Sequence, residues 1–326
     1  MRTRTWLVLV ACLAIAAVAG VALGSVPVAL ADIWRALAGQ GTGDALARTI
    51  VLDLRLPRVA LGALVGAGLG MSGAALQGTL RNGLAEPYLL GVSGGAAVGA
   101  VLVVVVLGAS GGTVPAAAFA GALVAVVTVL AVARAAGGRG DPRLLLMAGV
   151  VVGAFANAAI MIALANAPAN TVRGATWWMM GSLADADWTQ VGWLAAYVAT
   201  GGAALVAMAR QVDILALGAE AAASLGVEPD AASRRIFLAA SLTCAATVAA
   251  AGLVGFVGLV VPHLARGAGG RGHRTVIVAS ALVGATLVIA ADLGARVVLR
   301  PVELPLGAVT ALVGVPFFLA RLRRLA

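Results

Sequence analysis

Long apolar runs separated by short polar segments extend along the whole chain. The run from Val59 to Thr79 contains no charged residue, and a helix of that length crosses a hydrocarbon core of about 30 Å. The pattern predicts an all-α polytopic membrane protein, folded as a single transmembrane domain over residues 1–326. We expect ten transmembrane helices, at approximately residues 6–24, 59–79, 89–107, 114–133, 144–165, 190–209, 236–252, 254–266, 275–293 and 305–320.

The count of ten depends on residues 236–265, a nearly uncharged stretch that is too long for one span and too short for two full ones. Cytoplasmic loops are enriched in arginine and lysine. With ten spans and a cytoplasmic N-terminus, 15 of the 22 arginines are cytoplasmic, including those of the basic tail Arg321, Arg323 and Arg324. Nine spans would place that tail outside. We therefore predict a chain break near residues 252–255 and two cytoplasmic termini.

Composition excludes several classes of protein. Hydrophobic residues make up 62% of the chain and charged residues 11%, which is too little charge to cover a soluble surface. Every basic residue is arginine, so the lysine-containing phosphate loop of an ATPase is impossible here. The arginines are scattered among apolar runs, which argues against nucleic-acid binding. Cys12, Cys244 and His263 lack the spacing of a metal site, and we expect no metal and no catalytic residue on this chain.

The N-terminal apolar run has two interpretations. Arg2 and Arg4 precede it, and Ala29-Leu30-Ala31 resembles a signal-peptide cleavage site. The run is unusually long for a signal peptide, so we favour an uncleaved first span.

Several motifs resemble the FecCD-like permeases, the membrane subunits of type II ABC importers for ferric siderophores, haem and cobalamin. They are R-L-P-R from Arg55, S-G-x-x-x-Q ending at Gln77, R-N-x-L-A-x-P from Arg81, L-G-V-S-G-G-A, G-x-x-x-F-V-G-L-V-x-P-H-x-x-R from Gly252, A-D-x-x-A-R, and E-L-P-x-G from Glu303. The likeness covers nearly the full length, with one departure at Gly83, where the family usually has proline.

The resemblance implies the type II ABC importer permease fold and a homodimer in the bacterial inner membrane. Its partners would be membrane lipid, an extracytoplasmic substrate-binding protein and two ATP-binding subunits, which would hold ATP and Mg while this chain carries no cofactor. It leaves open which chelate is imported. The alternative is an ion-coupled secondary transporter with no ATPase partner, which needs intramembrane carboxylates or histidines. Asp292 is near a span, but we expect it to pair with Arg296.

Four arginines are candidates for docking the binding protein, because in the family such arginines meet its glutamates. Arg55 and Arg58 precede a helix on the predicted outer side, where both topology and the helix dipole disfavour arginine, so we expect no role in local stability. Arg296 and Arg300 flank the last outer loop. The alternative is contact with lipid headgroups, with an Asp292–Arg296 pair.

Residues 217–227 resemble the short helix that couples the permease to its ATPase. The candidate coupling residues are Leu217, Gly218, Glu220, Leu225 and Gly226, with Gly226 a plausible helix stop. A simple interfacial helix is the alternative.

Polar residues at membrane depth are candidates for the transport pathway. Gln77, Asn82 and Asn157 either line it or make hydrogen bonds between helices. Arg173, beside Trp177 in the outer segment 166–189, either meets an anionic chelate or is a surface residue. Asp141 and Pro142 occupy the position of the family's inner gate, with a departure from its usual hydroxyl pair that leaves the gate chemistry open.

Overall fold

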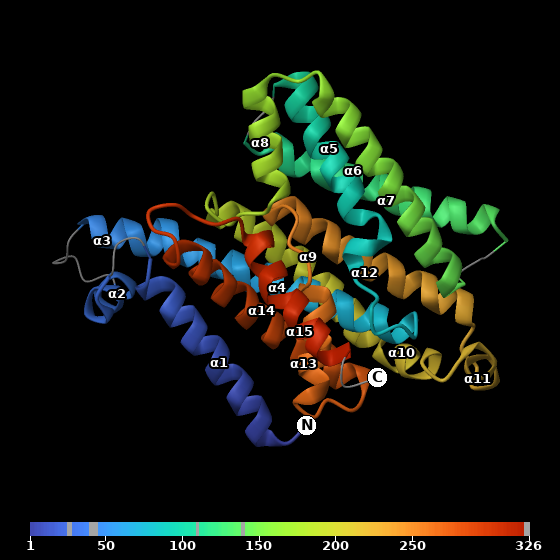
Figure 1. Ribbon diagram of the computed structural model, residues 1–326. Coiled ribbons are helices and arrows are strands. Elements are labelled where there is room, and N and C mark those ends of the chain that lie inside the picture. Colours follow the sequence, from blue (N-terminus) through green and yellow to red (C-terminus); the bar gives the residue numbers. More distant parts are fainter. Residues whose placement is uncertain (25–27, 39–44, 109–110, 138–140, 323–326) are drawn as a thin grey trace.

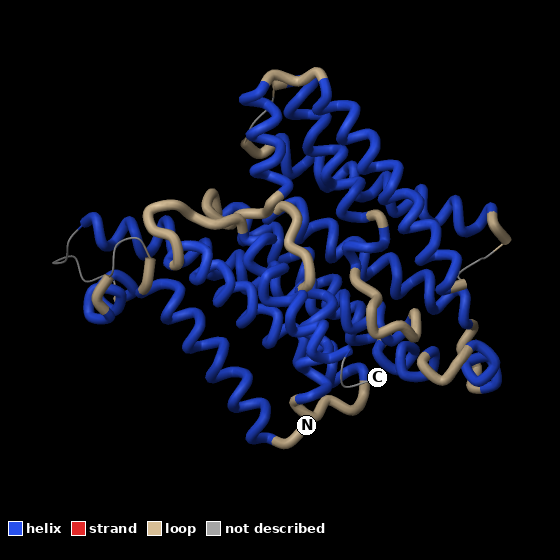
Figure 2. The backbone as a smooth tube through the Cα atoms, in the orientation of Figure 1, coloured by secondary structure: helices blue, strands red, loops and turns tan. Residues whose placement is uncertain are grey.

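The computed structural model describes residues 1–24, 28–38, 45–108, 111–137 and 141–322, and every regular element in these ranges is helical (Figures 1 and 2). The longer helices are α1 (Thr3–Ala22), α4 (Leu56–Thr79), α5 (Val92–Leu107), α6 (Thr113–Ala135), α7 (Pro142–Ala165), α9 (Trp188–Ala207), α12 (Pro229–Ala251), α14 (His273–Val297) and α15 (Leu306–Leu322). The shorter ones are α2 (Leu30–Leu37), α3 (Ala45–Thr49), η1 (Ile50–Arg55), η2 (Pro87–Leu90), α8 (Ala169–Met179), α10 (Ala209–Leu215), α11 (Ala219–Ser224) and α13 (Val257–Gly267).

Seven helices in the described residues are long and apolar enough to cross a membrane, namely α1, α4 with the residues before it, α6, α7, α9, α12 and α14. Helices α5 and α15 are shorter and apolar. Helix α13 has 11 residues, about half the length of an ordinary transmembrane helix. A multi-pass membrane protein is therefore indicated, while the count of ten spans stays a prediction. Arg323 and Arg324 of the basic tail lie outside the described residues.

The second span begins earlier than predicted. Helical backbone is continuous from Ala45 to Thr79, whereas the sequence predicted a span that starts at Val59. The six-residue π-helix η1 precedes Pro57, and the amide of Leu56 donates to the carbonyl of Val51, five residues back. A proline inside an α-helix cannot pair with the carbonyl four residues before it. The wider π-helical turn offers a way to carry the helix into this proline.

The break predicted within residues 236–265 is confirmed. Helix α12 ends at Gly252, which has a left-handed φ of +70°, and α13 starts after Phe256, a non-glycine residue with φ +67°. Helix α12 starts before the predicted residue 236, because the carboxylate of Glu228 caps it by accepting from the amides of Asp230 and Ala231, and Pro229 occupies its first turn.

Helices α4 and α14 pack in direct backbone contact at the centre of the molecule. A Cβ built on Gly66 would overlap the carbonyl of Gly284, and one built on Gly284 would overlap the carbonyl of Gly66. Gly70 lies equally close to the backbone of Ser280. Small residues permit this approach, as expected for membrane helices that pack without a hydrophobic driving force.

The remaining helices surround this pair (Figure 1). Helices α5, α6, α7 and α8 form a group at the upper right, and α12 contacts both this group and α4. Helix α1 lies at the edge against α14, and its buried residues are Gly20 and Val21.

Helices α4 and α14 run antiparallel, which defines two ends of the molecule. We call the start of α4, the end of α14 and the loop 298–305 the arginine end. The end of α4, the start of α14, α10 and α11 form the α11 end.

Candidate functional site

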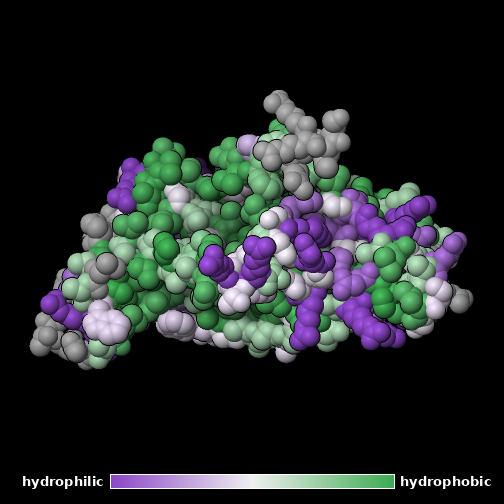
Figure 3. All heavy atoms as spheres, turned by 90° about the horizontal axis from the view of Figure 1, so that it is seen from below, coloured by the Kyte–Doolittle hydropathy of each residue, from purple (hydrophilic) through white to green (hydrophobic). Residues whose placement is uncertain are grey.

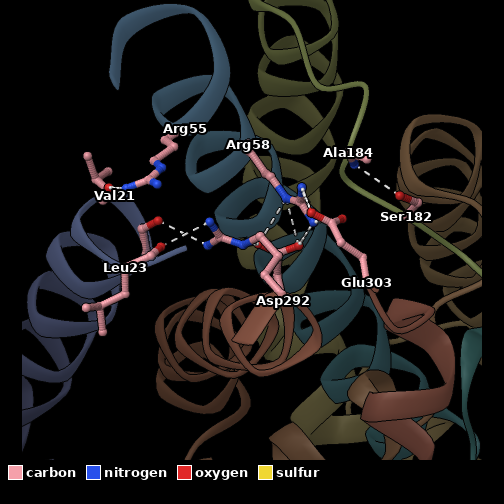
Figure 4. A network of polar contacts seen from close by, with 10 residues as sticks. Val21, Leu23, Arg55, Arg58, Ser182, Ala184, Asp292 and Glu303 are labelled. Atoms are coloured by element: carbon pink, nitrogen blue, oxygen red, sulfur yellow. Dashed lines mark hydrogen bonds and ion pairs between the residues drawn. The ribbon is translucent and has the colours of Figure 1, made fainter. Parts of the chain in front are cut away.

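Arg58 binds two carboxylates at the arginine end (Figure 4). Its Nε and NH2 groups donate to Asp292 of α14 at 2.8 to 3.2 Å. Its NH1 and NH2 groups donate to Glu303 of the loop 298–305, at 3.2 and 2.9 Å. Bidentate contacts of this kind are among the stronger hydrogen bonds in proteins. They tie α4, α14 and the loop together.

Arg55 and Arg296 are buried and bind the end of α1. Arg55 donates to the carbonyls of Val21 and Ala22 at 2.7 and 3.0 Å, and Arg296 donates to the carbonyls of Gly20 and Leu23 at 3.0 and 3.3 Å. The last carbonyls of a helix lack partners within it and carry partial negative charge. The expectation that Arg55 and Arg58 have no role in local stability is therefore wrong.

The predicted Asp292–Arg296 pair is confirmed, with 3.0 Å between Oδ2 of Asp292 and Nε of Arg296. Of the four docking candidates, Arg300 is the exposed one. It lies in the loop 298–305 with the exposed apolar side chains Val298, Leu299 and Val302. The structure thus brings Arg55, Arg58 and Arg296 together around α1 and α14 and leaves Arg300 on the surface. Docking by any of them stays a prediction.

The predicted coupling segment contains a short helix, α11, stopped by Gly226 with φ +78°. The amide of Val227 donates to the carbonyl of Ala222, and that of Gly226 to the carbonyl of Ala223, the pattern of a glycine-terminated helix. Leu217 and Leu225, at its two ends, are 65% and 57% exposed. These exposed leucines, together with Glu220 on the surface, form a protruding apolar surface with one carboxylate.

Asp213 and His273 connect this segment to the central helices, and neither was predicted from the sequence. Oδ1 of Asp213 in α10 accepts from the amide of His273 at 2.9 Å and lies 2.6 Å from its Nδ1. The His273 ring also packs against Gly78 of α4. Helix α14 has no cap from its own N-cap residue, Gly272, so Asp213 acts as the cap from another helix. A glycine before a long helical run hints at a missing cap, but the sequence does not say which carboxylate supplies it.

Gln77 makes hydrogen bonds between helices, one of the two alternatives left open by its sequence. Its Nε2 donates to the carbonyls of Gly258 and Leu259 at 3.2 Å each, and its Oε1 accepts from Arg266 at 2.7 Å. Both donors of the amide are used and the side chain is buried. Gln77 therefore holds α13 against α4.

Asn82 and Asp141 both stabilise local backbone. Oδ1 of Asn82 accepts from the amide of Leu84 at 2.9 Å, and Oδ1 of Asp141 accepts from the amide of Arg143 at 2.8 Å, capping the helix that starts at Pro142. These contacts leave a gate role for Asp141 and Pro142 as a prediction.

Asn157 and Arg173 are exposed, on α7 and α8. Helix α8 itself lies in the segment where no helix was predicted. A cavity of about 1050 Å³ opens beside the end of α8, lined by aromatic side chains that include Trp177, Trp193 and Tyr197. Arg173 does not line it.

Within the described ranges, no group of three or more His, Cys, Asp and Glu side chains could hold a metal ion. Cys244 is buried and Cys12 is exposed on α1.

The chain is similar to known proteins in both sequence and structure. The sequence profile of the FecCD transport family matches residues 12–324. The cobalamin import system permease protein BtuC of Halobacterium salinarum is 44% identical over 282 residues, covering 85% of this chain and 74% of the relative. The hemin transport system permease protein HmuU of Yersinia pestis is 37% identical over 306 residues, covering 91% and 90%. A solved structure described as an inward-facing conformation of a metal-chelate type ABC transporter superposes with a TM-score of 0.89, at 25% identity and over 99% of this chain and all of the other.

Proposed function

Because this chain belongs to the FecCD transport family, we propose that it is the permease subunit of an ATP-driven importer of a metal chelate in the bacterial inner membrane. The observation that supports this proposal is that two separate groups of charged or exposed side chains lie at opposite ends of the packed helix pair α4 and α14. The arginine end offers Arg58 and Arg300, and the α11 end offers the exposed leucines of the coupling segment.

The α11 end is proposed to face the cytoplasm. It carries a group of arginines at helix ends, as expected from the positive-inside rule. They are Arg81, Arg210, Arg234, Arg235, Arg266, Arg271 and Arg274. Figure 3 views the molecule from below, and polar side chains gather in it on the side where α10 and α11 lie. The ten-span topology with two cytoplasmic termini is part of the same proposal.

The permease is proposed to act as a homodimer through α7. One face of this helix exposes Met147, Val151, Phe155 and Ile162. Asn157 is exposed on the same helix. A polar side chain at membrane depth is expected to face protein or water and not lipid. Disulfide cross-linking of Asn157→Cys in native membranes would test this contact, with a covalent dimer as the expected product.

ATP and Mg would be bound by two partner subunits at the α11 end, and the substrate would arrive on an extracytoplasmic binding protein at the arginine end. The relatives are named for cobalamin and hemin, and the resemblance of the motifs adds ferric siderophores, so these three chelates are the substrates to test. The ion-coupled alternative is disfavoured because Asp292 is already paired with Arg58 and Arg296.

Reconstitution provides the test. Proteoliposomes containing this chain and its ATPase should take up one of the three chelates only with ATP, Mg and the binding protein. Uptake driven by an ion gradient without the ATPase would refute the proposal.

A further inference from the structure

The guanidinium of Arg58 is nearly saturated by the two carboxylates that it binds. Its Nε–H and one N–H of NH2 are directed to Asp292, while the second N–H of NH2 and one N–H of NH1 are directed to Glu303. Arginine has five N–H donors in all. One donor remains, which is too few for a second acidic group to bind by two parallel hydrogen bonds.

The two carboxylates differ in how firmly they are held. The Asp292 side chain is 4% exposed, lies on the central helix α14 and also pairs with Arg296. The Glu303 side chain is 46% exposed and lies in the loop 298–305. Removing Asp292 would take a buried carboxylate away from both Arg58 and Arg296, whereas Glu303 can move into water at little cost. Glu303 is therefore the exchangeable ligand of Arg58.

The surroundings of Glu303 fit an acidic partner with apolar contacts. Arg300 adds a positive charge on the surface, and Val298, Leu299 and Val302 expose apolar side chains in the same loop. The backbone that follows Glu303 is fixed by two hydrogen bonds. The amide of Leu304 donates to the carbonyl of Ala295 at 3.0 Å, and that of Leu306 to Gly181 at 3.0 Å. Release of Glu303 can thus remain local to the loop.

We propose that an acidic protein docks at the arginine end by carboxylate exchange, in which a carboxylate of the partner replaces Glu303 on Arg58. Glu303 is then an internal competitor that weakens docking. This inference rests on the proposed function, because the partner is the extracytoplasmic binding protein. It adds that affinity is limited by a contact within the permease itself.

The test uses the full chain with its ATPase in lipid nanodiscs and the purified binding protein of the same transporter. Glu303→Gln should bind that protein about two- to five-fold more tightly than the wild type, because an exposed ion pair no longer has to be broken. Glu303→Asp keeps the charge but shortens the reach to Arg58, and should also bind more tightly.

A matched control separates exchange from general electrostatics. Asp32→Asn removes an exposed carboxylate of α2 that pairs with Arg35 and not with Arg58, so it should leave the affinity unchanged. Wild-type binding with no tightening in either Glu303 variant, or equal tightening in Asp32→Asn, overturns the exchange. Failure of the wild type to bind at all overturns the proposed function instead.

Discussion

Gln77 supplies the hydrogen bond that Pro262 cannot make. The carbonyl of Gly258 lies four residues before Pro262 in α13, and proline has no amide hydrogen to donate to it. Nε2 of Gln77, from α4, donates to that carbonyl at 3.2 Å. A proline inside a short helix is thereby tolerated, and the helix is fixed to its neighbour by the same contact.

Replacing Gln77 with leucine should lower the free energy of unfolding by about 2 kcal/mol or more, because two carbonyls and Arg266 lose a buried partner. Thermal unfolding of the purified protein in detergent would measure the loss. In a Pro262→Ala background the helix can satisfy Gly258 itself, so the same substitution should cost less there. An equal loss in both backgrounds would show that Gln77 does not compensate for the proline.

Glu86 should make stability depend on pH. Burial in the turn between α4 and η2 raises the pKa of Glu86 from 4.5 to about 7, opposed by a hydrogen bond from the backbone of Phe256. The folded protein therefore favours the neutral acid, and its stability should fall as pH rises from about 4.5 to about 7 and then level off.

Glu86→Gln, which is neutral at every pH, should unfold with a flatter pH profile. It should be more stable than the wild type at pH 8, by at most about 3 kcal/mol, and similar at pH 5. Thermal unfolding midpoints between about pH 5 and pH 8 would measure this difference in stability. The exposed Glu220→Gln is the control and should retain the wild-type slope. A Glu86→Gln protein with that same slope would contradict the assignment.

Gly66→Ala should separate the central helices, because the new methyl group would overlap the backbone of Gly284. Overpacking of this kind costs about 1–3 kcal/mol or more. Gly192→Ala in α9 has nothing within 4 Å of the added methyl and should be neutral or stabilise by up to about 1 kcal/mol through helix propensity. Similar thermal stability of the two variants would refute direct backbone contact between α4 and α14.

Asp213→Ala should uncouple ATP hydrolysis from uptake in the reconstituted transporter. It removes the cap on α14 and the contact between α10 and His273, at a cost of about 1 kcal/mol in stability. Asp213→Asn retains an acceptor oxygen and should restore most of the uptake. Measuring ATP hydrolysis and uptake in the same proteoliposomes distinguishes a loss of coupling from a loss of folded transporter. Hydrolysis and uptake that fall in parallel in Asp213→Ala would indicate a merely structural role.

Patterns local in sequence predicted much of the fold. The long uncharged runs predicted the spans, the distribution of the arginines predicted the break near Gly252, and Gly226 predicted the stop of α11. The early start of the second span was missed because Arg48 and Asp53 interrupt its apolar pattern, although charged residues can occupy the end of a helix outside the hydrocarbon core.

The candidate site was predicted only in part, because its contacts join distant residues. The sequence identified Arg55 and Arg296 as unusual, yet their partners are backbone carbonyls of α1, which any sequence provides equally. Glu303 appeared in a motif, but its contact with Arg58 requires knowing that α4 and α14 lie antiparallel. The contact between Asp213 and His273 was not predicted for the same reason, because it joins residues that are far apart in the sequence.

The reciprocal fit of Gly66 and Gly284 restricts how this molecule can move. Sliding either helix along the other by one residue would bring a side chain against a main-chain oxygen, since Val65, Ala67, Val283 and Ala285 flank the two glycines. We therefore expect the two helices to tilt together as one rigid body, so that a displacement of α14 at His273 also moves Arg58 at the opposite end of the pair.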